Sequence, residues 1–522
     1  MLFAESNLPE LVSSDLVNLG PVFRHFMAET ILVLTIPIIL LVDLKVGKER
    51  RDEAAAKIGL LALVTAFFFA LFQPSGSGIV VAKIFRADGL AQVFRVIAIA
   101  TGMVAAVATL RTGQVKKGRS EFFVLLLGAV AGACLTAAAN DLAVLYLAVE
   151  TLSICGYLLA GIKKEDLAGS EAAMKYVIFG AVSSCFMLFG MSLLYGFAGT
   201  LTITTPEGSE IVSLASRANA AAGSPAYLIA LIMVMGGFAY KVAAAPFQFW
   251  CPDVYEGSPT PVAAFLAVAS KGAGFAAILR IVGAATGAGS VVTDSLAVSS
   301  EHFRLLLLFM AVITITLGNV AALRQNNSKR LLAYSAIAHA GYLLLGVAVT
   351  TDFGASAVIF YMVVYFFMTL GAFYLVGIVE RDTGRTDVDA FEGLGYRSPW
   401  LAACMFLFLV SLTGLPPTAG FVGKFLIFKE VFAYSGEHGS QLFFWGGVIG
   451  LLNAPIGLYY YMRFAKVMYL CDQKRLPEGT KVRFAGLDKG LMYAVAAPVL
   501  LLGIFFGGLI GLAQDAARGI FQ

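Results

Sequence analysis

Apolar stretches long enough to cross a bilayer recur along nearly the whole chain of 522 residues, and they constrain its fold more than any other feature. A transmembrane helix needs about 20 mostly apolar residues, because the hydrocarbon core of a bilayer is about 30 Å thick. The composition agrees, since 59% of the residues are apolar and only 13% are charged, a balance that water-soluble domains do not show. We therefore predict an all-α integral membrane protein of about fourteen transmembrane helices.

The predicted spans divide evenly between the two halves of the chain, and the loops between them leave no room for a soluble domain. The first seven cover residues 26–46, 57–73, 88–110, 120–138, 140–162, 169–197 and 225–252. The second seven cover residues 260–285, 301–324, 328–350, 355–380, 399–432, 442–470 and 488–513. We predict N-terminal helices 1–3 (1–119), a five-helix unit (120–285), a second five-helix unit (301–470) and a C-terminal helix (488–522).

Basic residues are distributed unevenly between alternate loops. One set of loops carries Lys45, Lys48, Arg50, Arg51, Arg111, Lys116, Lys117, Arg119, Lys163, Lys164, Lys329, Arg330, Arg381, Arg385, Arg397, Lys474, Arg475, Lys481 and Arg483. The opposite set, with the termini, has little beyond Arg24, Lys83, Arg86, Arg217, Arg304 and Arg518. Lysine and arginine concentrate in cytoplasmic loops. The contrast predicts an even number of spans, with both termini outside the cytoplasm.

Two predicted spans contain clusters of proline and glycine. The seventh runs YKVAAAPFQFWCPDVYEGSPTP, and the twelfth contains LTGLPPTAGFVGKF. Because proline removes a backbone donor, we predict that these helices unwind near Pro246 and near Pro416 and Pro417, which is tolerated only beside protein or a wet cavity. Each is fourth in its five-helix unit, as in transporters built from repeats. Five is odd, so the second unit is predicted to be inverted.

Ionisable residues inside the spans are functional candidates, because a charge at the bilayer centre costs about 2.5–3.5 kcal/mol or more. The candidates are Glu150, Lys175, Lys241, Lys271, His339 and Lys424. Lys241 and Lys271 are separated by a half-helix out to the loop at 252–259 and a half-helix back, so their amines should lie at similar depth. Lysine suits a proton relay, because its protonation responds to burial and to neighbouring charges.

A purely structural role is the alternative for each of these residues. Glu150 would then neutralise Lys241, and the other lysines would extend to the interface or lie in small polar pockets. His339 by itself fits a satisfied interior histidine equally well. Arg95 and Arg280 lie near span ends and are predicted to extend to the interface. For the whole set the relay is favoured, because packing does not require so many midspan charges.

The sequence offers no site for a cofactor, a metal ion or nucleic acid. The six cysteines are scattered singly, and there is no C-x-x-C, Gly-rich phosphate loop or flavin motif. The formal net charge of +4 is spread over many loops and makes no nucleic-acid footprint. Residues 1–25 are too polar for a signal peptide, so the first span is expected to remain in the mature protein.

Four segments around these residues resemble the antiporter-like subunits of respiratory complex I, the proton-pumping NADH:quinone oxidoreductase, and their relatives in multi-subunit Na⁺/H⁺ antiporters. The segments are VETLSICGYLLAG, SEAAMKYVIFGAVSSCFMLFGMSLLYG, YKVAAAPFQFWCPDVYEGSPTPVAAFLAVASKGAGF and NSKRLLAYSAIAHAGYLLLG. The resemblance extends over nearly the whole chain. It implies that Glu150 and Lys241 form a pair, that Lys271 is the central proton carrier, and that Lys424 faces the exit.

The lysine at position 424 and the short C-terminus are similar to the subunit N branch of this family, which includes mitochondrial subunit 2. This implies a proton-translocating subunit of the bacterial inner membrane with periplasmic termini, beside antiporter-like subunit M and small K and J type subunits. NADH, FMN, iron–sulfur clusters and quinone would bind in partner subunits. A subunit of a Na⁺/H⁺ antiporter and a non-conducting scaffold are the alternatives. Residues 1–25 extend beyond a typical subunit N, and the sequence gives them no function.

Overall fold

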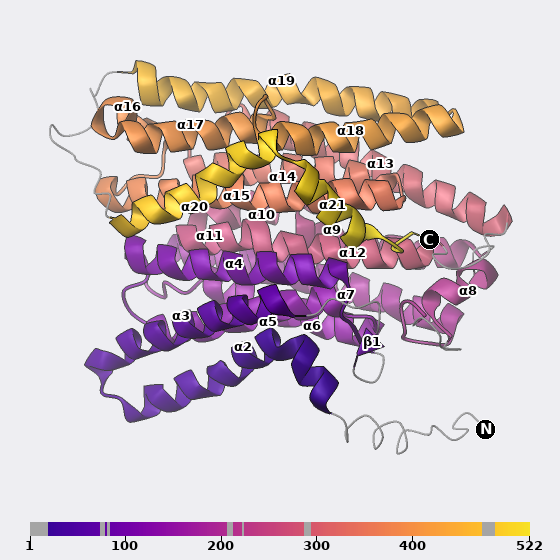
Figure 1. Ribbon diagram of the computed structural model, residues 1–522, viewed down its shortest axis with the longest axis horizontal. Coiled ribbons are helices and arrows are strands. Elements are labelled where there is room, and N and C mark those ends of the chain that lie inside the picture. The colour runs from indigo at the N-terminus through magenta and orange to yellow at the C-terminus, as the bar shows by residue number, and fades with distance from the viewer. Residues whose placement is uncertain are drawn as a thin grey trace.

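A computed structural model describes residues 19–73, 79–80, 84–205, 212–221, 224–286, 294–471 and 486–521. In these ranges long helices lie side by side in one bundle (Figure 1). Two short strands, β1 (Ile79–Val80) and β2 (Phe85–Arg86), pair antiparallel in a loop. The part of the predicted N-terminal extension before residue 19 lies outside the described residues.

The helices follow one another with short connections. The first group comprises α2 (Leu19–Lys45), α3 (Lys48–Phe72), α4 (Gly89–Thr112), α5 (Arg119–Ala138), α6 (Leu142–Ala160), α7 (Leu167–Ala198), α8 (Leu214–Ala221), α9 (Pro225–Val242), α10 (Trp250–Gly257), α11 (Thr260–Phe265), the π-helix η1 (Leu266–Ser270) and α12 (Lys271–Ala285). The second comprises α13 (Asp294–Ala322), α14 (Ser328–Ala348), α15 (Asp352–Thr383), the 3₁₀ helix η2 (Val388–Phe391), α16 (Leu394–Arg397), α17 (Pro399–Thr413), α18 (Ala419–His438), α19 (Gln441–Leu470), α20 (Gly486–Ile504) and α21 (Gly507–Ala517).

The helices confirm the predicted membrane architecture. Thirteen candidate spans are long and apolar enough to cross a membrane within the described ranges, and each matches one predicted span. One of them combines α11, η1 and α12. The remaining predicted span, the twelfth, consists of α17 with 15 residues and α18 with 20 residues. The prediction of about fourteen spans is therefore correct. The inverted relation between the two five-helix units stays a prediction.

Both predicted helix breaks are present. Helix α9 ends at Val242, where Ala243 adopts a φ of 58°, and the helix resumes with α10 at Trp250. Helix α17 ends at Thr413, where Gly414 adopts a φ of 86°, and α18 begins at Ala419. The prolines between the half-helices lack the N–H groups that a continuous helix would need. The breaks therefore expose helix ends inside the bundle.

The two ends of the bundle differ in charge. The turns after α2, α4, α6 and α15 lie close together at one end, as shown by the ion pairs Lys117–Glu165 and Lys164–Glu121 and by the hydrogen bond from Arg381 to the Arg111 carbonyl. We call this end, on the left of Figure 1, the basic face. Helix α2 begins and α21 ends at the opposite end, the far face, as an even number of spans requires.

Two arginines compensate buried carboxylates, so the prediction that they extend to the interface was wrong. Arg280 donates through Nη1 and Nη2 to Asp88 at 2.8 and 2.7 Å, and Arg95 donates through Nε to Glu29 at 2.5 Å. Burial by itself raises the pKa of the Asp88 carboxyl, but Arg280 and Arg86 outweigh this effect and hold that pKa below its usual value. Asp88 also caps α4 by accepting from the Ala91 N–H.

We expect Arg280→Gln to destabilise the protein by about 3–5 kcal/mol, because the substitution leaves the Asp88 carboxylate without its compensating charge. Thermal unfolding of the detergent-solubilised protein measures this loss. Arg518→Gln is the matched control, since Arg518 forms an exposed pair with Asp515 and such pairs contribute little. Equal unfolding temperatures for the two variants would contradict the expectation.

Candidate functional site

Glu150 and Lys241 each form a hydrogen bond with a serine hydroxyl group, and the two serines are different. Lys241 Nζ donates to Ser153 Oγ at 2.8 Å, and Glu150 accepts a hydrogen bond from the Ser184 hydroxyl. Ser153 follows Glu150 by three positions on α6, so the two side chains lie on the same face of that helix. Between the described residues Glu150 and Lys241 there is no direct salt bridge. Their contact through one water stays a prediction.

Lys241 lies beside two helix ends and a close helix contact. It occupies the last turn of α9, immediately before the break, and its side chain is buried. The partial negative charge at a helix C-terminus favours a cation there. A Cβ added at Gly274 would lie 3.4 Å from Lys241 Cγ, so α12 approaches this lysine closely. Gly274 is one turn from Lys271, and the two lysines therefore border the same helix face.

Lys271 is the first residue of α12, directly after the π-helical turn η1. Its side chain is only 1% exposed, its ammonium donates to the Ala336 carbonyl of α14, and it lies 5.6 Å from the centre of the Tyr365 ring. Wide helical turns of this kind are frequent at functional sites, because they displace the backbone of one helix face. The turn here orients Lys271 into the protein interior.

His339 is buried within a cluster of tyrosines. Its Nδ1 lies 2.6 Å from the Tyr361 hydroxyl and its Nε2 lies 3.4 Å from the Tyr461 hydroxyl. The rings of Tyr365 and Tyr342 lie 5.4 and 6.0 Å from the imidazole, measured between ring centroids. Since Tyr365 also faces the ammonium of Lys271, the cluster reaches from Lys271 to both nitrogens of the imidazole.

Lys424 caps the broken end of α17. Its Nζ donates to the carbonyls of Leu412 and Thr413 at 3.0 and 2.9 Å and lies 4.6 Å from the centre of the Tyr342 ring. The last carbonyls of a helix have no partner within the helix and carry partial negative charge. In the structure the amine of Lys424 binds these carbonyls directly. The break thus supplies the ligand of the buried ammonium.

These side chains form a row across the bundle, through α9, α12, α14 and α18; Figure 1 shows α12, α14 and α18 following one another upward. Among the described residues, no carboxylate lies within salt-bridge distance of Lys241, Lys271 or Lys424. Hydroxyls, carbonyls and aromatic rings take that place. Buried amines in such surroundings are candidates for changes in protonation.

Lys175, the remaining predicted relay residue, lies in different surroundings. Its amine pairs with Glu171 at 2.8 Å and with Asp253 at 2.7 Å, and its side chain is 39% exposed. Asp253 also accepts from Arg330, whose helix starts at the basic face. The structure therefore places Lys175 in a surface ion network and not beside the buried row.

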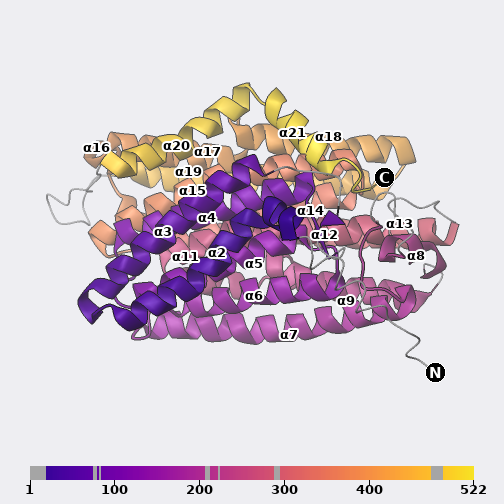
Figure 2. The ribbon, with the colours of Figure 1, turned by 60° about the horizontal axis from the view of Figure 1, so that its bottom comes forward.

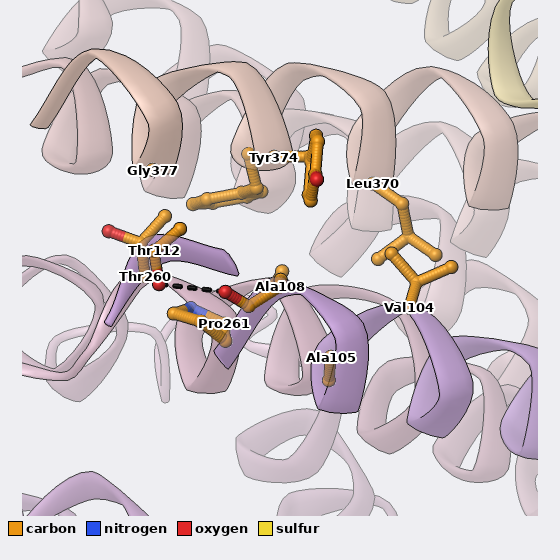
Figure 3. Close-up of a pocket in the computed structure, with 11 residues that line it drawn as sticks. Val104, Ala105, Ala108, Thr112, Thr260, Pro261, Leu370, Tyr374 and Gly377 are labelled. Carbon is orange, nitrogen blue, oxygen red and sulfur yellow. Dashed lines mark hydrogen bonds between the residues drawn. The ribbon is translucent and has the colours of Figure 1, made fainter. Parts of the chain in front are cut away.

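The space between the basic face and Lys271 is nearly closed. Figure 3 shows a cavity of about 10 Å³ between α4, α11 and α15, lined by Thr112, Thr260, Tyr374 and apolar side chains. This volume is about that of one water. At the end nearer the basic face, Glu380 accepts from Gln114 at 2.6 Å and from the Thr260 hydroxyl. A proton crossing this region would meet a carboxylate first.

Sequence reasoning missed the serine and tyrosine side chains that contact the row. Ser153 and Tyr342 each lie three positions after a predicted residue on the same helix, and that spacing was the available signal. Tyr361 comes from α15, the helix after that of His339, and Tyr461 comes from α19, far away in the chain, and no local pattern marks either of them. Within the described ranges, no three His, Cys, Asp or Glu side chains gather where they could hold a metal ion.

Comparison with known proteins adds an independent finding. The family described as "NADH:quinone oxidoreductase/Mrp antiporter, TM" matches residues 139–450, more than half of the chain. The NADH-quinone oxidoreductase subunit N of Chlorobium chlorochromatii (strain CaD3) is 38% identical over 516 residues, which cover 97% of this chain and 96% of that protein.

Two solved structures share the fold. A chain of respiratory complex I from Thermus thermophilus with bound aureothin is 30% identical, with a TM-score of 0.74 and coverage of 93% of this chain and 99% of that chain. A chain of the Mrp complex from Dietzia sp. DQ12-45-1b is 19% identical, with a TM-score of 0.77 and coverage of 95% and 98%. At that identity the second likeness concerns the fold alone.

We expect Gly414→Ala to disturb the break in the twelfth span. An alanine at a φ of 86° costs about 1–2 kcal/mol, and its Cβ would lie 2.9 Å from Lys424 Cδ. Gly196→Ala in α7 is the control, because its Cβ would meet no atom within 4 Å. Thermal unfolding of both purified variants checks this. An unchanged unfolding temperature for Gly414→Ala alongside an unchanged control would show that the break does not need glycine.

Proposed function

Since this chain belongs to the NADH:quinone oxidoreductase/Mrp antiporter transmembrane family, we propose that it is a proton-translocating subunit, of the subunit N type, in a bacterial NADH:quinone oxidoreductase. The observation that carries the proposal is the row of buried amines and one imidazole that crosses the bundle without carboxylate partners in the described residues. Quinone is reduced in partner subunits of the complex, and this chain moves protons.

The protons pass between neighbours of the row through hydroxyl groups. A hydroxyl can donate and accept at once, and a lysine amine accepts a proton once it is neutral. Ser153 accepts the hydrogen bond of Lys241. The ring of Tyr365 lies between Lys271 and His339, and its hydroxyl makes no hydrogen bond within the described residues. The imidazole has a tyrosine hydroxyl at each nitrogen, so it can take a proton on one side and release one on the other.

Charge changes along the row couple its members. Packed helices lie about 8–10 Å apart, so amines on adjacent helices have similar spacing. At an effective dielectric constant of about 20, two unit charges 10 Å apart interact by about 1.7 kcal/mol, which changes a protonation equilibrium more than tenfold. Energy from redox chemistry reaches this chain as such a charge change. Glu150, the acid at the start of the row, is the residue at which it acts.

The remaining features follow from membership of the complex. NADH, FMN, iron–sulfur clusters and quinone bind in partner subunits, and the neighbours in the membrane are antiporter-like subunit M and small K and J type subunits. The basic face is cytoplasmic by the distribution of lysine and arginine, so both termini lie on the periplasmic side of the inner membrane. The two five-helix units, 120–285 and 301–470, are inverted repeats whose broken helices carry Lys241 and Lys424.

Reconstitution tests the proposal against the Na⁺/H⁺ antiporter and the scaffold. The purified complex is placed in liposomes, and internal acidification is followed with a pH-sensitive dye. We expect NADH and quinone to drive acidification in Na⁺-free buffer. Acidification that requires a Na⁺ gradient and ignores NADH would establish the antiporter instead, and full NADH-driven acidification with this chain's row disabled would establish a scaffold.

Substitution of Lys271 gives the sharpest single-residue prediction. We expect Lys271→Arg to abolish most proton pumping, as Lys271→Met does, because a guanidinium keeps the charge but does not release a proton in a protein. Lys429→Arg is the control, since Lys429 lies exposed on the helix of Lys424 and pairs with Glu430. Near-normal pumping by an assembled Lys271→Arg complex would end the claim that this lysine passes protons.

Ser153→Ala tests the hydroxyl that sequence reasoning missed. We expect the complex to assemble and pumping to fall about tenfold, which corresponds to about 1.4 kcal/mol for one lost hydrogen bond to a charged group. The control is Ser192→Ala, because the Ser192 hydroxyl is exposed and bonds only to the Phe189 carbonyl of its own helix. Unchanged pumping by Ser153→Ala would remove this hydroxyl from the relay.

A further inference from the structure

The last membrane helix is broken in the middle and leaves a cavity beneath it. Helix α20 ends at Ile504, and α21 begins at Gly507. Figure 1 shows that the axes of the two helices meet at an angle. Phe505 and Phe506 lie between them. Under this angle, α3, α4, α15, α20 and α21 line an open-sided cavity of about 660 Å³. The volume falls within the range of small-molecule sites, about 300–1,000 Å³.

One face of α4 borders this cavity along most of its length. Val93, Val96, Ala100, Val104 and Val107 line it and are only partly buried. These positions follow the spacing of one helix face, and most other residues of α4 are buried. Across the cavity lie apolar residues of α20 and α21, among them Leu491, Val495, Leu509 and Leu512. The wall is therefore almost entirely apolar, with aliphatic side chains in the majority.

The end of the cavity near the far face is polar. Gln73 lines it at the end of α3 and is 7% exposed, and neither its Nε2 nor its Oε1 forms a hydrogen bond with any residue that the structure describes. A buried amide without a partner costs about 1–3 kcal/mol. Gln92, which also lines this end, is already engaged with the Ala70 carbonyl and Arg95. The Gln73 amide can therefore donate a hydrogen bond to a molecule bound in the cavity and accept one from it.

From this geometry we infer that the cavity binds one acyl chain of a membrane glycerolipid, with its ester group at the Gln73 amide. A transmembrane helix of a partner subunit is the rival occupant, and it would leave the unchanged complex unlabelled in the test below. Sixteen residues of α4, from Gln92 to Val107, extend about 22 Å. That length suits one extended chain entering from the far leaflet and passing the middle of a core about 30 Å thick.

Photo-crosslinking tests this site on the whole complex in liposomes. The probe is phosphatidylglycerol with a diazirine in one acyl chain, and the readout is the amount of label on peptides of α4 and α20. We expect Ala100→Trp to abolish this labelling, because the indole fills the cavity. Ala181→Trp is the matched control, since Ala181 is exposed on α7, along the opposite edge of the bundle in Figure 2, and should leave labelling unchanged.

Gln73→Leu is a second variant that leaves the cavity open. It removes the polar anchor, worth about 1 kcal/mol, and should weaken labelling about fivefold.

Labelling that is the same in Ala100→Trp as in the unchanged protein would overturn the inference. If Ala100→Trp does not assemble, full labelling of Gln73→Leu would overturn the ester contact. Labelling by a diazirine-bearing isoprenoid quinone, without labelling by the phospholipid, would overturn the choice of a glycerolipid. NADH-driven pumping is not part of the readout, so the result is independent of the proposed function.

Discussion

The rest of this structure depends on keeping lysine amines inside a membrane protein without pairing them to carboxylates. A charged side chain at the bilayer centre costs about 2.5–3.5 kcal/mol or more, and a salt bridge is the usual compensation. Arg280 and Arg95 show that compensation near the far face, where each donates to a buried carboxylate. Lys271 and Lys424 have no such partner among the described residues and instead bind backbone carbonyls. The arginine sites hold charges that stabilise the fold, whereas the lysine sites hold amines whose protonation is proposed to change.

The broken helices are what make carbonyls available at that depth. A continuous helix uses its carbonyls internally, whereas a helix that ends inside the bundle leaves its last carbonyls free and concentrates partial negative charge there. Helix α17 ends at Thr413 and directs that end at Lys424, and α9 ends one residue after Lys241. The prolines and Gly414 of these segments therefore determine where partial negative charge lies in the bundle, as well as where the helices break. Gln73, at the end of the intact α3, shows the same need for a polar partner on the lipid side.

Much of the fold was predictable from the sequence, because lipid imposes a simple rule on length and polarity. All fourteen spans and both breaks follow from apolar runs and proline clusters, which are local features. The angle between α20 and α21 was missed, since an apolar run does not reveal a bend at Phe505. A site residue could be predicted only where its own type marks it, as a charged residue inside an apolar run does. Lys175 also carried that signal, yet its helix is 32 residues long and extends past the core into an ion network at the basic face.

The neighbours of the row explain why hydroxyl groups, and not acids, connect its members. A carboxylate beside each lysine would hold the ammonium form, and a proton trapped in a salt bridge is not handed on. A tyrosine or serine hydroxyl stays neutral, donates and accepts, and leaves each amine free to respond to the charge of the next. Tyr361, Tyr365 and Tyr461 come from two different helices, so their arrangement around His339 exists only in the folded protein. In the proposed relay Glu150 is the one acid of the row, and a change in its charge acts on neighbours that carry no compensating carboxylate of their own.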